Sequence, residues 1–169
     1  MKERETLIGK RIMEKNNIGL AGEMRVCAEF LKKGYQASIT FGNAKATDII
    51  VTSPAGRYLR VEVKTSKNGR NFMTGFFPKY TNPSKPHPDL WVFYLPDKDL
   101  STSGDRFFVA THDEVEEMQL IANKGNKTEK GKGADNIPLK VILEFSHEDA
   151  WTKTTRLLNS SEPVDGINF

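Results

Sequence analysis

The chain has 169 residues, 37% of them hydrophobic, which suits one globular domain with a core of ordinary size. The formal net charge of +3 permits a nucleic-acid partner without requiring one, and the single cysteine, Cys27, excludes an intramolecular disulfide and fits a reducing compartment. The charged start has no signal-peptide core behind it, and no run approaches roughly 18 apolar residues, so we expect a cytoplasmic protein with no membrane contact.

Residues 1–17 mix charges with scattered apolar positions and are interpreted as an N-terminal arm or a short helix. From residue 18 to residue 33 apolar residues recur at helical spacing, and Gly34 ends the pattern. At about 100° per residue, Glu23 falls inside the apolar arc, where a carboxylate must be paired or lie at the rim of a polar site. The alternative is a glutamate near the helix N-terminus that points to water. The predicted buried stripe consists of Met24, Cys27, Ala28 and Leu31, widened by Val26 and Phe30.

Residues 35–41 are predicted as a strand and residues 42–45 as a loop, and they lead into a β-hairpin over residues 47–64. Two β-branched runs flank Ser53-Pro54-Ala55-Gly56, in which Pro second and Gly fourth favour a type I turn. Matching the apolar faces places Ile49 opposite Val61. Val51 then lies opposite Leu59, because a slip of one residue would turn one apolar set away from the core.

The same register places Asp48 opposite Glu62 on the charged face of the hairpin, with Lys64 next along that face. Two carboxylates that face each other across strands repel, and a divalent cation or a shared proton between them would relieve the repulsion. The arrangement therefore predicts a metal site. The competing interpretation is a solvated face with an ion pair from Lys64 to Asp48 or Glu62, but such surface pairs contribute only about 0–1 kcal/mol.

Residues 65–88 form a long segment, rich in Gly and Pro, in which basic and aromatic residues are interleaved. Basic side chains neutralise phosphates and aromatic rings stack on bases, so the segment is a candidate nucleic-acid contact. The alternative is a small hairpin or flap whose aromatic rings cap the core. The basic candidates, including one residue from the loop before the hairpin, are Lys45, Lys67, Arg70, Lys79 and Lys85, and the aromatic residues are Phe72, Phe76, Phe77 and Tyr80.

Strands and helices alternate in the rest of the chain. Residues 90–95 are predicted as an apolar strand covered on both sides, and the preceding His87 and Asp89 are interpreted as a strand-entry turn rather than a metal or acid–base site. A strand over residues 106–110 precedes Thr111 and Glu114, a capping box that opens a helix to residue 122, with His112 as a helix-start residue. Residues 123–134 read as a basic loop, residues 139–145 as a last strand, the region of Trp151, Leu157 and Leu158 as a terminal helix, and residues 159–169 as a tail.

A helix with an inward glutamate, followed by a hairpin that carries Asp48 and then Glu62-Val63-Lys64, resembles the PD-(D/E)xK nuclease superfamily. Thr47-Asp48 takes the place of the motif's Pro-Asp, and Thr47 departs from the proline at a position that varies in the family. Glu23 matches the helical glutamate of several branches, including archaeal Holliday-junction resolvases. The resemblance covers about residues 18–95 and implies one restriction-endonuclease-like α/β domain over residues 18–158, with a central mixed β-sheet flanked by helices.

The resemblance also implies an endonuclease, dependent on Mg²⁺ or Mn²⁺, that acts on duplex or branched DNA. Asp48, Glu62 and the backbone carbonyl of Val63 would hold the metal. Glu23 would join them through a water or a second ion, and Lys64 would orient or deprotonate the attacking water. A homodimer is expected if both strands are cut. Two alternatives stay open: a nuclease-like protein that binds nucleic acid without cutting it, and an interaction domain with no nucleic-acid role.

Overall fold

The computed structural model describes residues 15–40, 46–80, 82–98 and 103–160. The helices are α2 (Lys15–Lys32), α3 (Phe76–Tyr80), α4 (His112–Ala122), α5 (Leu139–Leu143) and α6 (Thr152–Asn159). The strands are β1 (Gln36–Ile39), β2 (Ile49–Thr52), β3 (Tyr58–Thr65), β4 (Asn71–Met73), β5 (Leu90–Leu95), β6 (Arg106–Thr111) and β7 (Asn136–Pro138). The predictions for residues 1–14, for the loop at 42–45 and for the tail from residue 161 fall outside the described residues.

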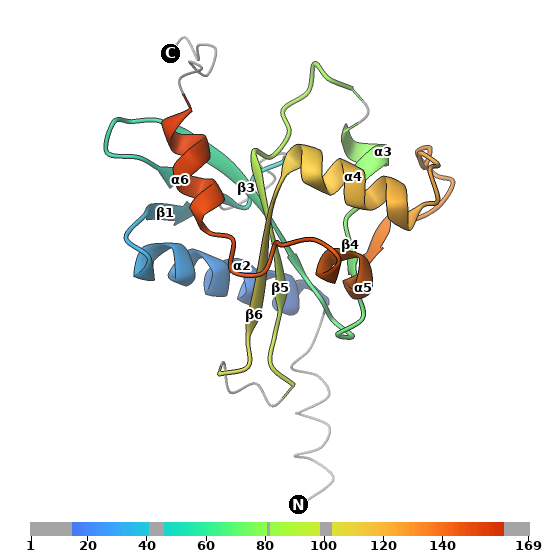
Figure 1. Cartoon of the computed structure of the whole chain (residues 1–169), viewed down its shortest axis with the longest axis horizontal. Coiled ribbons are helices and arrows are strands. Elements are labelled where there is room, and N and C mark those ends of the chain that lie inside the picture. The colour runs from blue at the N-terminus through green and yellow to red at the C-terminus, as the bar shows by residue number, and fades with distance from the viewer. Residues whose placement is uncertain (1–14, 41–45, 81, 99–102, 161–169) are drawn as a thin grey trace, which may run out of the picture.

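A five-stranded sheet in the order β1-β2-β3-β5-β6 runs through the middle of the molecule. It is mixed, because β3 and β5 run parallel while the other neighbouring pairs are antiparallel. Helices α2 and α6 cover one face, and α3, α4 and α5 lie toward the other, together with the small sheet of β4 and β7 (Figure 1). The predicted α/β class, with a central mixed sheet between helices, is confirmed.

The hairpin of β2 and β3 has the predicted register, with Ile49 paired to Val61. Its turn is closed by the Gly56 N–H, which donates to the Ser53 carbonyl at 2.9 Å. Val61 is the last residue of β3 that pairs with β2, yet β3 continues to Thr65. Among the described strands, none pairs with the β2 side of β3 beyond this point, and the charged residues of the hairpin lie there.

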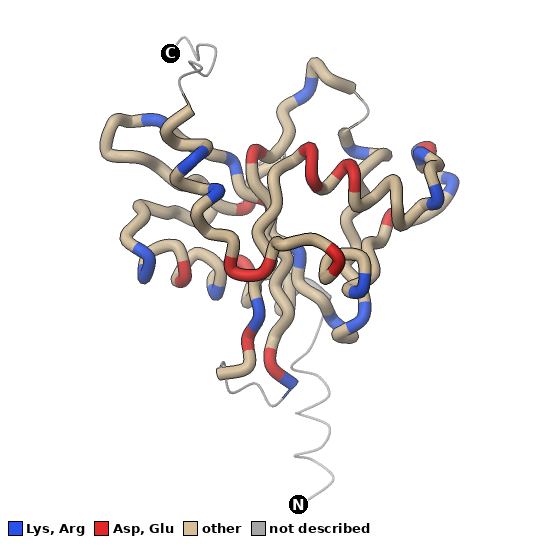
Figure 2. The backbone as a smooth tube through the Cα atoms, viewed as in Figure 1, with Lys and Arg blue, Asp and Glu red and all other residues tan. Residues whose placement is uncertain are grey.

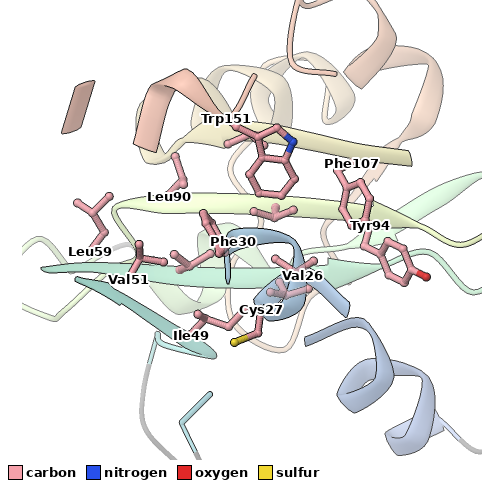
Figure 3. Packing of buried hydrophobic residues seen from close by; sticks show 14 of the residues in the cluster. Val26, Cys27, Phe30, Ile49, Val51, Leu59, Leu90, Tyr94, Phe107 and Trp151 are labelled. Atoms are coloured by element: carbon pink, nitrogen blue, oxygen red, sulfur yellow. The ribbon is translucent and has the colours of Figure 1, made fainter. Parts of the chain in front are cut away.

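The first core lies between the sheet and α2. Val26 and Phe30 are fully buried and pack against apolar residues of β2, β3, β5 and β6 (Figure 3). Trp151, just before α6, closes this core, and its ring meets that of Phe30 edge to face with centroids 5.1 Å apart. The predicted strand ahead of the hairpin is present over the four residues of β1.

The predicted buried stripe of α2 is wrong in part. Met24 and Leu31 are 49% and 54% exposed, and Ala28 is exposed as well. The row that faces the sheet is spaced four residues apart, as residues on one helix face are, and consists of Gly22, Val26 and Phe30. Because a glycine adds nothing to the apolar pattern, the pattern is dominated by residues one or two positions away from this row.

The second core lies on the opposite face of the sheet. It distinguishes between the two interpretations of residues 65–88, a nucleic-acid contact and a flap whose aromatic rings cap the core. Phe72, Phe76 and Phe77 are 0–3% exposed and pack on the β5 side chains Trp91 and Phe93. These three rings cap the core, so they are not available to stack on bases. The segment also pairs at long range, since β4 runs antiparallel to β7.

Helix α4 begins as its capping box predicts. The Thr111 hydroxyl accepts from the Glu114 N–H, and the Glu114 carboxylate accepts from the Thr111 N–H at 2.7 Å. The predicted helix over the region of Trp151, Leu157 and Leu158 is confirmed as α6. The prediction of a strand over residues 139–145 is wrong, because Pro138 closes β7 and the following five residues form α5. No helix in the described part of the chain has the length and apolar content needed to cross a membrane.

Candidate active site

Asp48 lies immediately before β2, and its carboxylate turns back onto β3. The Val63 N–H donates to Asp48 Oδ2 at 2.7 Å, and the Asp48 N–H donates to the Val61 carbonyl at 2.9 Å. The N–H and C=O of one residue in a strand point to the same side, and Val61 and Val63 are two residues apart. The carbonyl of Val63 therefore also points to the side where Asp48 lies.

Glu62 and Lys64 project from β3 on the side of the second core. The register of the hairpin, continued by one residue, places Glu62 opposite Asp48. The side chain of Glu62 is 7% exposed and that of Lys64 is 16% exposed, and the Lys64 ammonium donates to Glu62 Oε1. The Lys64 Nζ also lies 5.8 Å from the centroid of the Trp91 ring. The ion pair of the competing interpretation is present, but the face is not solvated, because the pair is largely buried.

Glu23 of α2 shares the electrostatic environment of this pair. Burial first, and then the negative charges of Asp48 and Glu62, raise the pKa of Glu23 to about 7, while Lys64 opposes the shift. Burial and the charge of Glu62 raise the pKa of Asp48 to about 6, against the hydrogen bond from Val63 and the charge of Lys64. For both carboxyl groups burial is the largest cause of the raised pKa, and neighbouring carboxylates act in the same direction.

Helix α3 adds two residues to the same place. The Lys79 Nζ lies 4.0 Å from Glu62 Oε1, and burial, followed by the charge of Lys64, lowers the pKa of Lys79. Burial, followed by the charges of Glu62 and Asp48, raises the pKa of the Tyr80 hydroxyl. The sequence predicts Lys79 only as one of several basic DNA contacts, and it does not predict that Tyr80 belongs to the site. A short helix that contains Pro78 gives little periodic signal from which to find them.

The residues fit a hard divalent cation such as Mg²⁺. In the described part of the chain, no group of three or more His, Cys, Asp and Glu side chains is arranged to hold a metal by itself. Asp48, Glu62 and the Val63 carbonyl nevertheless form an oxygen-only donor set at one edge of β3. Mg²⁺ is usually bound by one or two carboxylates while it keeps several waters, so Asp48 and Glu62 are enough to serve as its protein carboxylates.

The other predicted DNA contacts are not brought together with this site. Lys67 and Arg70 are exposed on the turn between β3 and β4, and Lys67 lines a cavity of about 520 Å³ with residues of the β5–β6 hairpin. Lys85 is exposed in the loop between α3 and β5, at the far end of the molecule from that turn (Figures 1 and 2). Lys45 lies outside the described residues. Lysines and arginines are scattered over several surfaces rather than gathered in one stripe (Figure 2).

The residues before β5 have structural roles, as the interpretation of a strand-entry turn expects. Asp89 Oδ2 accepts from the Arg60 N–H at 2.7 Å, which ties the start of β5 to β3. His112 is the first residue of α4, and its Nδ1 accepts from the Trp91 indole N–H at 3.2 Å. Burial lowers the pKa of His112 to about 4, which agrees with a neutral ring that accepts a hydrogen bond.

Comparison with solved structures places this fold beside that of a nuclease. The structure of the bacterial homing endonuclease I-Ssp6803I superposes with a TM-score of 0.53 at 16% sequence identity, over 85% of this chain and 93% of that one. The likeness concerns the fold alone. No protein-family model and no curated protein sequence matches the chain.

Proposed function

We propose that this protein is a metal-dependent endonuclease that hydrolyses phosphodiester bonds of DNA. The observation that carries the proposal is the convergence of Asp48, Glu62 and Lys64 at the part of β3 beyond its pairing with β2, with Glu23 of α2 in the same electrostatic environment. The carboxylates of Asp48 and Glu62 face each other across the two strands, and a divalent cation between them would relieve their repulsion. The proposal places the chain in the PD-(D/E)xK superfamily, in a branch that resembles the resolvases or the restriction and repair enzymes.

Each residue has a task that its position allows. Asp48 and Glu62, with the Val63 carbonyl, would hold the cation, which when bound withdraws charge from the phosphoryl oxygens and makes water a better nucleophile. Lys64 is held beside Glu62 and would orient the attacking water and offset charge on the phosphate. Glu23, whose pKa is raised to about 7, would accept a proton from a water at the rim of the site.

The similarity to a homing endonuclease supports DNA as the substrate class, although it reaches only the fold. Cleavage of both strands of a duplex would need two such sites, so we propose that the active form on duplex DNA is a homodimer. The single cysteine, which is buried, agrees with the cytoplasm as the working compartment.

The test is a cleavage assay on supercoiled plasmid, linear duplex, four-way junction and single-stranded DNA, with Mg²⁺ or Mn²⁺ and with EDTA. Asp48→Ala, Glu62→Ala and Lys64→Ala should each abolish metal-dependent cutting, and Lys140→Ala, at an exposed position of α5, should keep it. DNA binding that weakens with salt but never leads to cutting would replace the proposal with a non-catalytic DNA-binding protein. Absence of both binding and cutting would refute any role on DNA.

A further inference from the structure

Helix α3 lies against the site through Lys79. The Lys79 ammonium approaches Glu62 Oε1 at 4.0 Å while its side chain remains 52% exposed, so one end of the site faces solvent through this lysine. Lys64, by contrast, is 16% exposed and donates to the same carboxylate oxygen. One cation of the site is therefore buried and the other is accessible to an approaching anion.

A buried polar network fixes the position of α3. The carboxylate of Asp135, which is 0% exposed, accepts from the Phe77 N–H at 2.7 Å and from the Asn123 side-chain amide at 3.0 Å. The backbone carbonyl of Asp135 accepts from the N–H groups of Thr74 and Gly75. The Thr74 hydroxyl in turn donates to Gln119 Oε1 at 2.6 Å. The segment before β7 and helix α4 thus hold the start of α3 at several points.

Gly75 determines where the lysine stem lies. Its φ is +57°, and a Cβ added there would come within 3.3 Å of Lys79 Cε. The aliphatic part of Lys79 therefore folds back over the glycine toward β3. A side chain at residue 75 would push the stem away from Glu62 and would also be strained by the positive φ.

The charges of the site favour a phosphate at this lysine. Glu23, Asp48 and Glu62, when ionised, face the ammonium groups of Lys64 and Lys79, which leaves one negative charge in excess. A divalent cation would turn this into an excess of one positive charge, which is the charge that one phosphodiester neutralises. Without Lys79 the loaded site would have no excess charge with which to attract the phosphate.

On the basis of the function proposed above, we propose that Lys79 binds the scissile phosphate itself and that Asp135 is the positioning residue that sets α3 for this contact. Lys79 then stabilises the charge that develops on the phosphoryl oxygens during cleavage. It differs in this from the exposed lysines elsewhere, which would contact phosphates of the DNA backbone only to bind it.

The experiment uses the DNA of the panel above that wild type cuts fastest. Single-turnover cleavage at saturating protein is measured with Mg²⁺, and binding is measured in EDTA over a series of salt concentrations. Lys79→Met keeps most of the stem and removes the charge, Lys79→Arg restores a charge, and Lys140→Met is the control at an exposed lysine of α5. Asp135→Asn keeps the shape of the positioning residue, and it is combined with Lys79→Met in a double variant.

Lys79→Met should lower the single-turnover rate roughly 100-fold, the usual effect of losing one donor to a developing oxyanion, with less than about a threefold change in binding. Lys79→Arg should recover part of the rate. Asp135→Asn should slow cleavage in the wild-type background but add little to Lys79→Met, which a purely structural role would not produce. Circular dichroism and urea unfolding check that each variant is folded.

Three outcomes overturn the inference, and they are distinct. Wild type that cuts no DNA refutes the proposed function and this inference with it. Lys79→Met that cuts at the wild-type rate, but binds more weakly with a salt slope reduced by about one, makes Lys79 an ordinary backbone contact. Full additivity of Asp135→Asn and Lys79→Met removes Asp135 as a positioning residue.

Discussion

At Gly22 the backbone of α2 lies directly against Thr65 of β3. Replacing this glycine with alanine therefore tests how closely α2 packs on the sheet beside the site. A Cβ built at Gly22 would lie 1.9 Å from Thr65 Oγ1, 3.1 Å from Thr65 Cβ and 3.2 Å from Tyr94 Cδ1. Comfortable contacts between non-bonded heavy atoms are about 3.5–4.0 Å. Either α2 moves away from β3 by roughly 1.5 Å, or Thr65 changes its rotamer against a buried strand.

Gly19 provides the matched control. It lies in the same helix, and a Cβ there would meet nothing within 4 Å. Both substitutions gain about 1 kcal/mol from the helix propensity of alanine, so this contribution cancels between the two variants. The difference that remains is the cost of overpacking, about 1–3 kcal/mol. Gly19→Ala should therefore be more stable than wild type, and Gly22→Ala should be less stable than Gly19→Ala by this amount.

Urea unfolding followed by tryptophan fluorescence measures the difference, because Trp91 and Trp151 are both buried. Thr65→Ala should restore most of the loss in Gly22→Ala, since it removes the atom at 1.9 Å. Its own cost is small, because the buried Thr65 Oγ1 has no hydrogen-bond partner among the described residues. Equal stability of Gly22→Ala and Gly19→Ala would show that α2 does not approach β3 as closely as the structure places it.

Three further results are expected. Because the pKa of Asp48 is raised to about 6, the contribution of this carboxyl group to the stability of the metal-free protein is complete below about pH 4 and is lost as the pH rises through 6. Mg²⁺ should therefore raise the melting temperature more at pH 8 than at pH 5, and Asp48→Asn should abolish that difference. Burial, and then the charge of Lys153, lower the pKa of His147 to about 4. The contribution of this imidazole to the free energy of unfolding is therefore complete above pH 6.5 and is lost as the pH falls through 4. In urea titrations, His147→Gln should reduce this loss of stability at low pH. Thr111→Ala should cost about 1 kcal/mol by removing the capping box of α4, whereas Thr152→Ala, at an exposed position of α6, should change the unfolding free energy by less than about half of that.

The sequence predicts those parts of the fold in which apolar and charged residues alternate along a strand or a capping box begins a helix. The hairpin was found because its apolar and charged residues alternate, and the register Ile49–Val61 followed from matching the two faces. Helix α4 was found from the reciprocal bonds that Thr111 and Glu114 can make. Both signals are local, so neither needs knowledge of the tertiary structure.

The missing parts depend on contacts between distant residues. Phe77 and Asp135 are 58 residues apart, yet their hydrogen bond places α3, and no local pattern announces it. The predicted buried face of α2 is wrong in part because Gly22, which lies against β3, has no side chain and so adds nothing to the apolar pattern. The sequence predicts that Asp48, Glu62 and Lys64 share a face, but it does not predict their burial. Lys79, which lies beside Glu62, belongs to a segment for which both a nucleic-acid contact and a flap over the core stayed open.

The burial of this charged cluster is the strongest argument that it serves a purpose other than folding. Burial raises the pKa of a carboxyl group, neighbouring carboxylates raise it further, and such a shift lowers stability near neutral pH. Burial, which is the largest cause, and the charge of neighbouring carboxylates raise the pKa of both Glu23 and Asp48. Strongly shifted groups that share one cleft are typical of active sites. A cation and a phosphate would together balance the charges that the protein leaves unbalanced, and for this reason we propose that the chemistry takes place at the edge of β3 rather than at the cavity beside Lys67.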